Sequence, residues 1–314
     1  MTSPTGDQYE LALTSEGAHA RAVITQLAAG IREYSINGID LVEPFRVTDS
    51  PPMGAGIVLA PWPNRVRDGV WEHAGETQQL ALTEPARHNA IHGLLRFTPY
   101  RELERGVEAL RLGATVYPQP GYRFLLDTEV EYRLAADGLE VTHRIRNAGD
   151  GAAPVALGAH PYLRLGETPV DELVLRLSAA THIDVDERLN PVGESPVDDT
   201  EYDLRGGVPV GRLRLDDGFG GSLVVDGVVE HSLTAPDGRS VSVWGDEQFR
   251  YVQVFTPRSF PGGTAHDDSG TRLAVAVEPM TAPADALNSG AGLRWVQPGE
   301  TWTARWGIRH RGIV

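Results

Sequence analysis

Apolar and polar residues alternate along much of this chain, and this period of two constrains the fold more than any other feature. In "EALRLGATVY", Leu110, Leu112, Ala114 and Val116 fall on one side of the alternation. Because successive side chains of a β-strand point to opposite faces, this pattern is typical of strands with one buried face. Amphipathic helical patterns are absent, apart from a short candidate at Asp285 to Asn288. The sequence therefore predicts an all-β protein.

Turn residues separate the alternating segments. The 35 glycines and 22 prolines in 314 residues exceed the usual share of roughly 12%. Asp137–Gly138 and Asp237–Gly238 each lie between two alternating segments, a pattern typical of β-hairpins. The polar stretch from Asp184 to Gly207 is predicted to be a loop. Since strand signals continue on both sides of it, we expect residues 1–314 to form one domain of packed antiparallel sheets.

Charge and composition exclude several classes of function. The formal net charge of −15 disfavours nucleic acid and anionic membrane surfaces, but it does not disfavour a neutral ligand. The chain has no cysteine, so disulfides, thiolate metal sites and a cysteine nucleophile are excluded. Neither a signal peptide nor an apolar run of about 18 residues is visible, so we expect a cytoplasmic location. Both a monomer and a homodimer remain compatible with the sequence.

Two alternating segments end in a charged residue followed by proline. In "TRLAVAVEP", Glu278 falls on the opposite side from Val275 and Val277, together with two alanines. In "VALGAHP", His160 likewise shares its side with Ala156 and Gly158. Alone, each residue is also compatible with a structural role. Because the context is repeated and the neighbours are small, we interpret the two strands as walls of a cavity, with open space beside Glu278.

Three further segments could carry polar contacts. "PWPNR" resembles a rigid turn that directs Asn64 and Arg65, although a surface arginine is equally compatible. His88 and His92 have the i,i+4 spacing of a metal pair, but Pro85 and Gly93 flank them and no H-E-x-x-H pattern occurs, so no metal site is predicted. "LRLDDGF" places Asp216 and Asp217 in a glycine-rich turn that is too incomplete for a calcium loop.

Several familiar nucleotide and hydrolase motifs are missing. There is no Walker loop, no dinucleotide fingerprint and no G-x-S-x-G elbow. Chemistry driven by ATP, linked to NAD or typical of α/β-hydrolases therefore has no support in the sequence.

Taken together and in order, these segments resemble the aldose 1-epimerase (galactose mutarotase) family. The resemblance covers most of the chain, from about residue 54 to the C-terminus. Its motifs are "PWPNR", "NAIHG", "HPY", "LDDGF", "VQVFT" and "EPMTAPADALN". "HPY" alone is weak, but the ordered set is highly specific.

The resemblance implies a fold and a set of roles. The fold would be a β-supersandwich of large antiparallel sheets with a concave groove for a monosaccharide. Glu278 would be the catalytic base and His160 the catalytic acid. The sugar would be held by five further residues, namely Asn64, Arg65, His92, Asp216 and Gln253. Asp216 is preferred over Asp217 because the family's aspartate lies three residues before an aromatic residue, here Phe219.

The implied reaction interconverts the α and β anomers of a free aldose. Opening the ring removes a proton from the anomeric hydroxyl and delivers one to the ring oxygen, and each positioned group typically contributes about 10²–10⁴-fold. No metal or redox cofactor is required. We expect Glu278 to be ionised and His160 to be protonated in the resting site, with Arg65 or His92 assisting at the ring oxygen.

Other functions stay open at this point. A hexose-6-phosphate epimerase of the same fold would need extra basic residues for the phosphate. A glycosidase would need two carboxylates flanking one bond, for which Glu278 and Asp216 could be mistaken. A non-catalytic carbohydrate-binding protein would not need the pair of Glu278 and His160. The identity of the aldose lies in loop geometry and cannot be read from the sequence.

Overall fold

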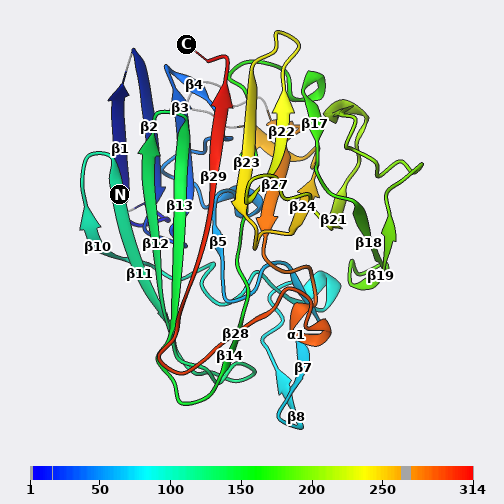
Figure 1. The fold of residues 1–314 in the computed structure, drawn as a ribbon. Helices are drawn as coiled ribbons and strands as arrows, with labels where there is room; N and C mark the ends of the chain where they lie inside the picture. The colour runs from blue at the N-terminus through cyan, green and yellow to red at the C-terminus, as the bar shows by residue number, and fades with distance from the viewer. Residues whose placement is uncertain (1–2, 16, 263–269, 314) are drawn as a thin grey trace.

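Two large antiparallel sheets and one smaller sheet form the body of the molecule (Figure 1). The computed structural model describes residues 3–15, 17–262 and 270–313. Within these residues, the largest sheet has nine strands in the order β10-β11-β12-β13-β29-β23-β22-β17-β20. Their bounds are β10 Arg101–Arg105, β11 Ala109–Val116, β12 Leu126–Ala135, β13 Gly138–Asn147, β17 Val174–Arg176, β20 Val208–Pro209, β22 Val228–Thr234, β23 Ser240–Asp246 and β29 Thr301–Arg311.

The second sheet carries the candidate site residues of the C-terminal half. It runs β19-β18-β21-β24-β27-β15-β5, and β16 also pairs with β27. Its strands are β5 Val58–Leu59, β15 Gly158–Ala159, β16 Tyr162–Leu163, β18 Thr181–Val185, β19 Pro191–Pro196, β21 Asp216–Gly220, β24 Tyr251–Phe255 and β27 Val275–Met280. In Figure 1, β24 and β27 lie behind β22 and β23, and β27 is in contact with β23.

A smaller sheet, four strand pairs and several helical turns complete the described part of the chain. A four-stranded sheet contains β1 Gln8–Ser15, β2 Ala18–Thr25, β3 Ile31–Ile36 and β4 Ile39–Asp40, and it packs against β11 and β12. Two-stranded pairs are β6 Arg65–Arg67 with β9 Asn89–Ile91, β7 Val70–His73 with β8 Glu76–Gln79, β14 Ala153–Val155 with β28 Arg294–Val296, and β25 Phe260–Gly262 with β26 Gly270–Arg272. The helical turns are η1 Pro52–Gly54, η2 Pro85–Arg87, η3 Val170–Glu172, η4 Val210–Arg212 and α1 Ala286–Ser289. None of the described helices is long and apolar enough to cross a membrane.

Alternation in the sequence becomes one buried and one exposed face in the structure. Along β12, the side chains of Val130, Tyr132 and Leu134 are buried, whereas the charged residues between them are not. Burying each such side chain stabilises the fold by roughly 1.5–3 kcal/mol relative to leaving it in water. The main hydrophobic core joins this face to residues of the second sheet, including Val275 and Val277. The prediction of an all-β protein with packed antiparallel sheets is confirmed.

Both predicted hairpins are present. β12 and β13 are joined by Ala136 and Asp137, with Gly138 as the first residue of β13, and β22 and β23 are joined around Asp237 and Gly238. The short helix α1 lies within one residue of its predicted position.

The prediction that residues Asp184 to Gly207 form a loop is partly wrong. β19 lies inside this range and pairs with β18 as an antiparallel edge strand. Its side chains are exposed or half-buried, so it lacks the apolar alternation by which strands are recognised. Prolines at both of its ends, Pro191 and Pro196, are also typical of an edge strand.

The space expected beside Glu278 on the alanine face is filled. Ala274 and Ala276 pack in a second hydrophobic cluster with Phe45, Tyr162 and Phe260. The small residues therefore accommodate aromatic side chains from neighbouring segments, and the prediction of an open wall at these two alanines is wrong. The cavity described below begins only at Glu278.

Candidate active site

A cavity of about 240 Å³ lies beside the second sheet, where Gln253 and Glu278 face it from within β24 and β27. All seven residues proposed from the sequence line it, although they come from six different segments of the chain. They are Asn64, Arg65, His92, His160, Asp216, Gln253 and Glu278. Five further residues complete the lining, namely Met53, Glu84, Arg87, Ile91 and Phe255.

Strand register brings His160 and Glu278 together. β27 pairs with two short strands on either side of His160, with Gly158 opposite Met280 and Tyr162 opposite Ala276. Because both pairings are antiparallel, His160 comes to lie level with Glu278. The imidazole Nε2 and the carboxylate Oε1 are 3.3 Å apart. Pro161 and Pro279 directly follow these two residues in the sequence. The two similar segments seen in the sequence therefore meet at the same place in the structure.

Burial opposes a charge on either member of this pair. The side chains of His160 and Glu278 are 6% and 3% exposed. Burial lowers the pKa of His160 to about 4, and burial together with the nearby Asp216 carboxylate raises the pKa of Glu278 well above its usual value. Both shifts oppose the expected resting ion pair, because each group favours its neutral form when it is removed from water. We therefore expect a resting pair without net charge, with the transferable proton on Glu278.

Each member of the pair also has an atom without a hydrogen-bond partner. Within the described part of the chain, His160 Nδ1 and Glu278 Oε2 are buried and unpaired. Buried polar atoms are nearly always satisfied, so unpaired atoms at a cavity indicate groups that a ligand can contact.

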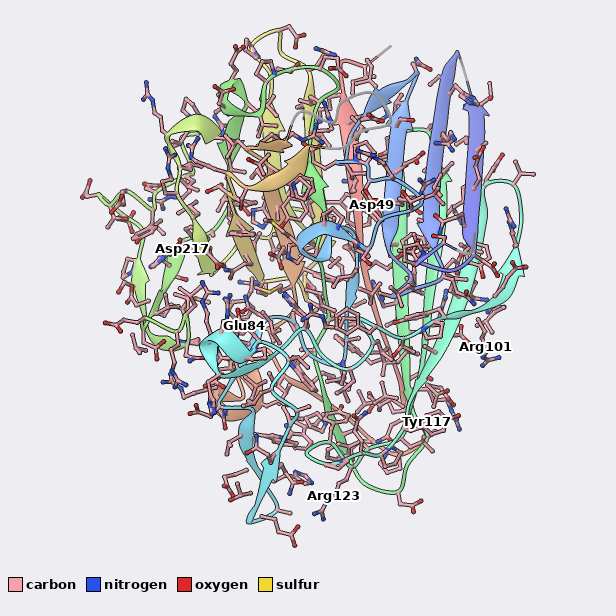
Figure 2. All side chains as sticks on the ribbon, turned by 180° about the vertical axis from the view of Figure 1, so that it is seen from behind. Asp49, Glu84, Arg101, Tyr117, Arg123 and Asp217 are labelled. Atoms are coloured by element: carbon pink, nitrogen blue, oxygen red, sulfur yellow. The ribbon has the colours of Figure 1, made fainter. Side chains whose placement is uncertain are left out.

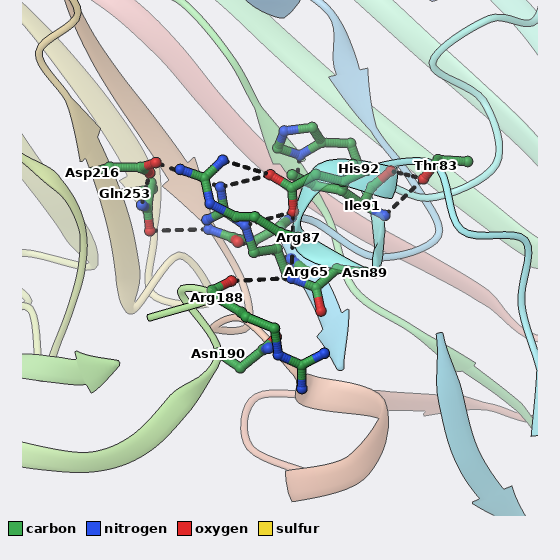
Figure 3. Close-up of polar contacts among 12 residues, drawn as sticks. Arg65, Thr83, Arg87, Asn89, Ile91, His92, Arg188, Asn190, Asp216 and Gln253 are labelled. Carbon is green, nitrogen blue, oxygen red and sulfur yellow. Dashed lines mark hydrogen bonds and ion pairs between the residues drawn. The ribbon is translucent and has the colours of Figure 1, made fainter. Parts of the chain in front are cut away.

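A polar network fixes the residues opposite the pair (Figure 3). Asn64 Nδ2 donates to Gln253 Oε1 at 2.9 Å, and Gln253 Nε2 donates to Asp216 Oδ1 at 3.0 Å. Arg65 Nη2 reaches Asp216 Oδ2 at 3.4 Å. Strand register again explains the arrangement, because Gln253 lies directly opposite Glu278 on the neighbouring strand. Both ends of the Gln253 amide are used, so its orientation is set.

The two aspartates of "LDDGF" point to different partners. Asp216 lines the cavity, whereas Asp217 accepts from His182 Nε2 at 2.8 Å. The second oxygen of Asp217 accepts the backbone N–H of Asp216 at 3.0 Å. Asp217 therefore supports the strand end that carries Asp216 and does not itself line the cavity.

His92 lies on a turn above the pair. Its backbone has a φ of 63°, and its N–H donates to Asn64 O at 2.9 Å. Its Nδ1 accepts from the Asn64 backbone N–H at 3.3 Å, which leaves Nε2 to carry the proton. The His92 ring packs edge-on against His160 with the centroids 5.5 Å apart. Burial lowers the pKa of His92, so it is a neutral hydrogen-bond donor.

His88 does not join His92. Its side chain is 61% exposed and contacts Asp68 outside the cavity. In the described ranges, no group of three or more His, Cys, Asp or Glu side chains is placed to hold a metal ion.

Glu84 is a cavity residue that the sequence reasoning missed. Its carboxylate receives two hydrogen bonds from Arg65, from Nε at 2.9 Å and from Nη2 at 3.1 Å. Figure 2 shows Glu84 beside the turn η2. No local pattern distinguishes this glutamate, because its partner is 19 positions earlier in the chain. Phe255 could have been found, since it shares the strand face of Gln253.

Comparisons with known proteins agree with this picture. The family model for aldose 1-epimerase matches residues 10–309. An uncharacterized protein of Escherichia coli strain K12, YihR, is 33% identical over 281 residues, which cover 89% of this chain and 86% of YihR.

Solved structures share the fold at low sequence identity. The GalM/aldose epimerase homologue from C. elegans superposes with a TM-score of 0.82 at 16% identity, over 98% of this chain and 100% of that one. Galactose 1-epimerase from Lactobacillus acidophilus NCFM gives 0.73 at 18% identity, over 97% and 98%. The fold is thus the galactose mutarotase-like arrangement of antiparallel sheets, and the chain belongs to the aldose 1-epimerase family.

Proposed function

We propose that this protein is an aldose 1-epimerase that interconverts the α and β anomers of a free hexose of the glucose or galactose type. The observation that carries the proposal is the contact of 3.3 Å between His160 Nε2 and Glu278 Oε1 at a cavity of monosaccharide size. Each of these groups keeps an unpaired atom for a ligand. Family membership supports the same reaction class.

The proposed mechanism starts from a neutral imidazole at His160 and a protonated carboxyl at Glu278. Transfer of this proton from Glu278 to His160 along their contact creates a carboxylate base and an imidazolium acid. Glu278 then takes the proton of the anomeric hydroxyl, the bond between C1 and the ring oxygen breaks, and His160 protonates the ring oxygen. Rotation about the C1–C2 bond and reversal of these transfers yield the other anomer and restore the resting pair.

The remaining cavity residues would bind the sugar hydroxyls. Asp216 supplies carboxylate acceptors, Arg65 and the Nε2 of His92 supply donors, and Asn64 and Gln253 hold the network together. Polar groups that are fixed by other protein groups can discriminate between hydroxyl orientations, because a mismatched sugar leaves them unpaired.

Charge balance in the cavity favours a neutral sugar over a phosphorylated one. The two arginines that line it, Arg65 and Arg87, both contact Glu84, and Arg65 also contacts Asp216. A phosphate group would need positive charge that carboxylates do not already neutralise. Asp216 is occupied by Gln253 and Arg65, which also makes it a poor partner for Glu278 in a glycosidase mechanism.

Polarimetry on freshly dissolved α-glucose and α-galactose tests the proposal. We expect the wild-type protein to accelerate the approach to anomeric equilibrium, and Glu278→Gln to lower this rate by about 10²–10⁴-fold because it removes the base but keeps the shape. Glu140→Gln, an exposed residue on β13, is the matched control and should keep wild-type activity.

Three results would contradict the proposal. Sugar binding without acceleration would favour a carbohydrate-binding protein. Acceleration with phosphorylated hexose alone would favour the hexose-6-phosphate enzyme. Full activity of Glu278→Gln would remove the assigned base.

A further inference from the structure

We propose that Glu84 is a positioning residue for the reaction, which fixes the Arg65 guanidinium so that its contact with Asp216 stays long and both groups can bind the sugar. This inference rests on the proposed function. Glu84 carries no role in the sequence motifs and lies outside the pair that handles protons. Its contribution follows from how its carboxylate is shared among its neighbours.

A bidentate contact fixes the guanidinium. Arg65 Nε and Nη2 donate to the two oxygens of Glu84 at 2.9 and 3.1 Å. The two side chains are only 7% and 15% exposed. A paired arrangement of this kind sets both the position and the plane of the guanidinium.

The backbone around Glu84 makes this anchor rigid. Arg65 begins β6, which pairs with β9. Glu84 is joined to the start of β9 by two backbone hydrogen bonds, from Glu84 N to Asn89 O at 2.9 Å and from Asn89 N to Glu84 O at 3.2 Å. Arg65 and Glu84 are thus both held in place by the strand pair of β6 and β9.

The oxygens of Glu84 are occupied by protein donors. Besides Arg65, Oε1 accepts from Arg87 Nη1 at 3.3 Å, and Oε2 accepts from Asn89 Nδ2 at 3.4 Å. A carboxylate with two donors on each oxygen has little capacity left for sugar hydroxyls. Glu84 therefore acts through Arg65 and is not itself a ligand of the sugar.

Asp216 is the competing partner of Arg65. Arg65 Nη2 lies 3.4 Å from Asp216 Oδ2, which is a longer contact than either one to Glu84. Without the Glu84 charge, the buried guanidinium would be drawn closer to Asp216, the other carboxylate that it contacts. Arg65 and Asp216 would then satisfy each other and withdraw two groups from the sugar.

A double-mutant cycle tests this inference. Arg65 would contact the sugar in the ground state and in the transition state alike, so Glu84→Gln should raise KM by about 10-fold while kcat changes by less than about threefold. In an Arg65→Met background, the same Glu84 substitution should change KM by less than about twofold, because the group it acts through is gone. Asp203→Asn removes a bidentate carboxylate partner of Arg205 that does not line the cavity, and it should leave KM unchanged.

Two outcomes would overturn the inference. One is an equal loss with and without Arg65, which would mean that Glu84 acts on the sugar or on the fold. The other is an unchanged KM in Glu84→Gln. If circular dichroism shows that Glu84→Gln is unfolded, the same double-mutant cycle can be measured with Glu84→Asp. This substitution keeps the charge, but its side chain is too short to maintain both hydrogen bonds with Arg65.

A failure of the proposed function gives a different result. Calorimetric Kd values for glucose can replace KM in the cycle. A wild-type protein that binds glucose without accelerating its mutarotation would therefore overturn the proposed function, while the cycle on Kd would still decide the role of Glu84.

Discussion

In the proposed mechanism, the contact between His160 and Glu278 supplies both an acid and a base when one proton moves between them. Burial disfavours a charge on each group, so we expect a neutral resting pair, and transfer of the proton over 3.3 Å would create the reactive form. In this mechanism, a bound sugar would stabilise that form by hydrogen bonding to the buried, unpaired atoms His160 Nδ1 and Glu278 Oε2. The free-energy cost of charge separation would then be offset only when the substrate is bound.

This protonation state leads to a prediction at the level of the residue. At neutral pH the His160 imidazole should be neutral in ¹⁵N NMR spectra, and it should become charged only as the pH falls toward about 4. Activity should fall over the same acid range, because protonating His160 while Glu278 still holds its proton leaves the site without a base. At high pH, activity should fall as the pH rises through the raised pKa of Glu278, since the pair then lacks an acid.

The His160 signal is identified by its loss in His160→Asn. An imidazolium signal from His160 at neutral pH would contradict the prediction and restore the resting ion pair. The pH profile must be corrected for the acid- and base-catalysed reaction without protein.

At the level of elements, short turns position the side chains proposed to bind the sugar. The turn after β9 places His92 over the site, and Gly93 in this turn has a φ of +70°. A Cβ on Gly93 would lie 2.1 Å from the carbonyl oxygen of Ala60. The turn therefore depends on glycine both for its backbone conformation and for a close approach to the neighbouring chain.

Gly93→Ala tests this requirement. A left-handed conformation costs a non-glycine residue about 1–2 kcal/mol, and the collision with Ala60 should add to that cost and displace His92. Gly227→Ala is the matched control, because Gly227 has a φ of +79° but no atom within 4 Å of the added Cβ. In urea unfolding, Gly93→Ala should lose clearly more stability than Gly227→Ala and should also lose activity. Equal losses in the two variants would show that the close approach is unimportant.

For the whole molecule, the C-terminal strand holds the largest sheet together. β29 lies in the middle of the nine strands, between β13 and β23. Its Trp306 is only 1% exposed, and its Nε1 donates to the buried His143 Nε2 at 3.0 Å. Burial lowers the pKa of His143 to about 3, so this nitrogen is a neutral acceptor.

Trp306→Ala should therefore destabilise the entire fold. Removing a buried tryptophan typically costs about 3–5 kcal/mol, and here it also leaves His143 Nε2 without its donor. Trp295→Ala is the control, since Trp295 is 41% exposed. Thermal unfolding should show a large decrease in Tm for the first variant and a small one for the second. Similar decreases would mean that the core around β29 does not limit stability.

The sequence by itself determined the fold class, the hairpins and the set of residues that line the site. Alternation is a local property, so β12 and its hairpin could be predicted from adjacent residues alone. The ordered motifs named all seven predicted residues that line the cavity, although their roles stay a prediction. The edge strand β19 was missed because its residues, PVGESP, are exposed or half-buried and show no apolar alternation, although its backbone pairs with β18.

Only the tertiary structure decided how these residues act on one another. His160 meets Glu278 because β15, β16 and β27 pair across more than a hundred positions, and no local pattern encodes that register. Glu84 joins the site through Arg65 for the same reason. The protonation of the pair depends on its burial, and burial is a property of the packed molecule, not of any segment of it.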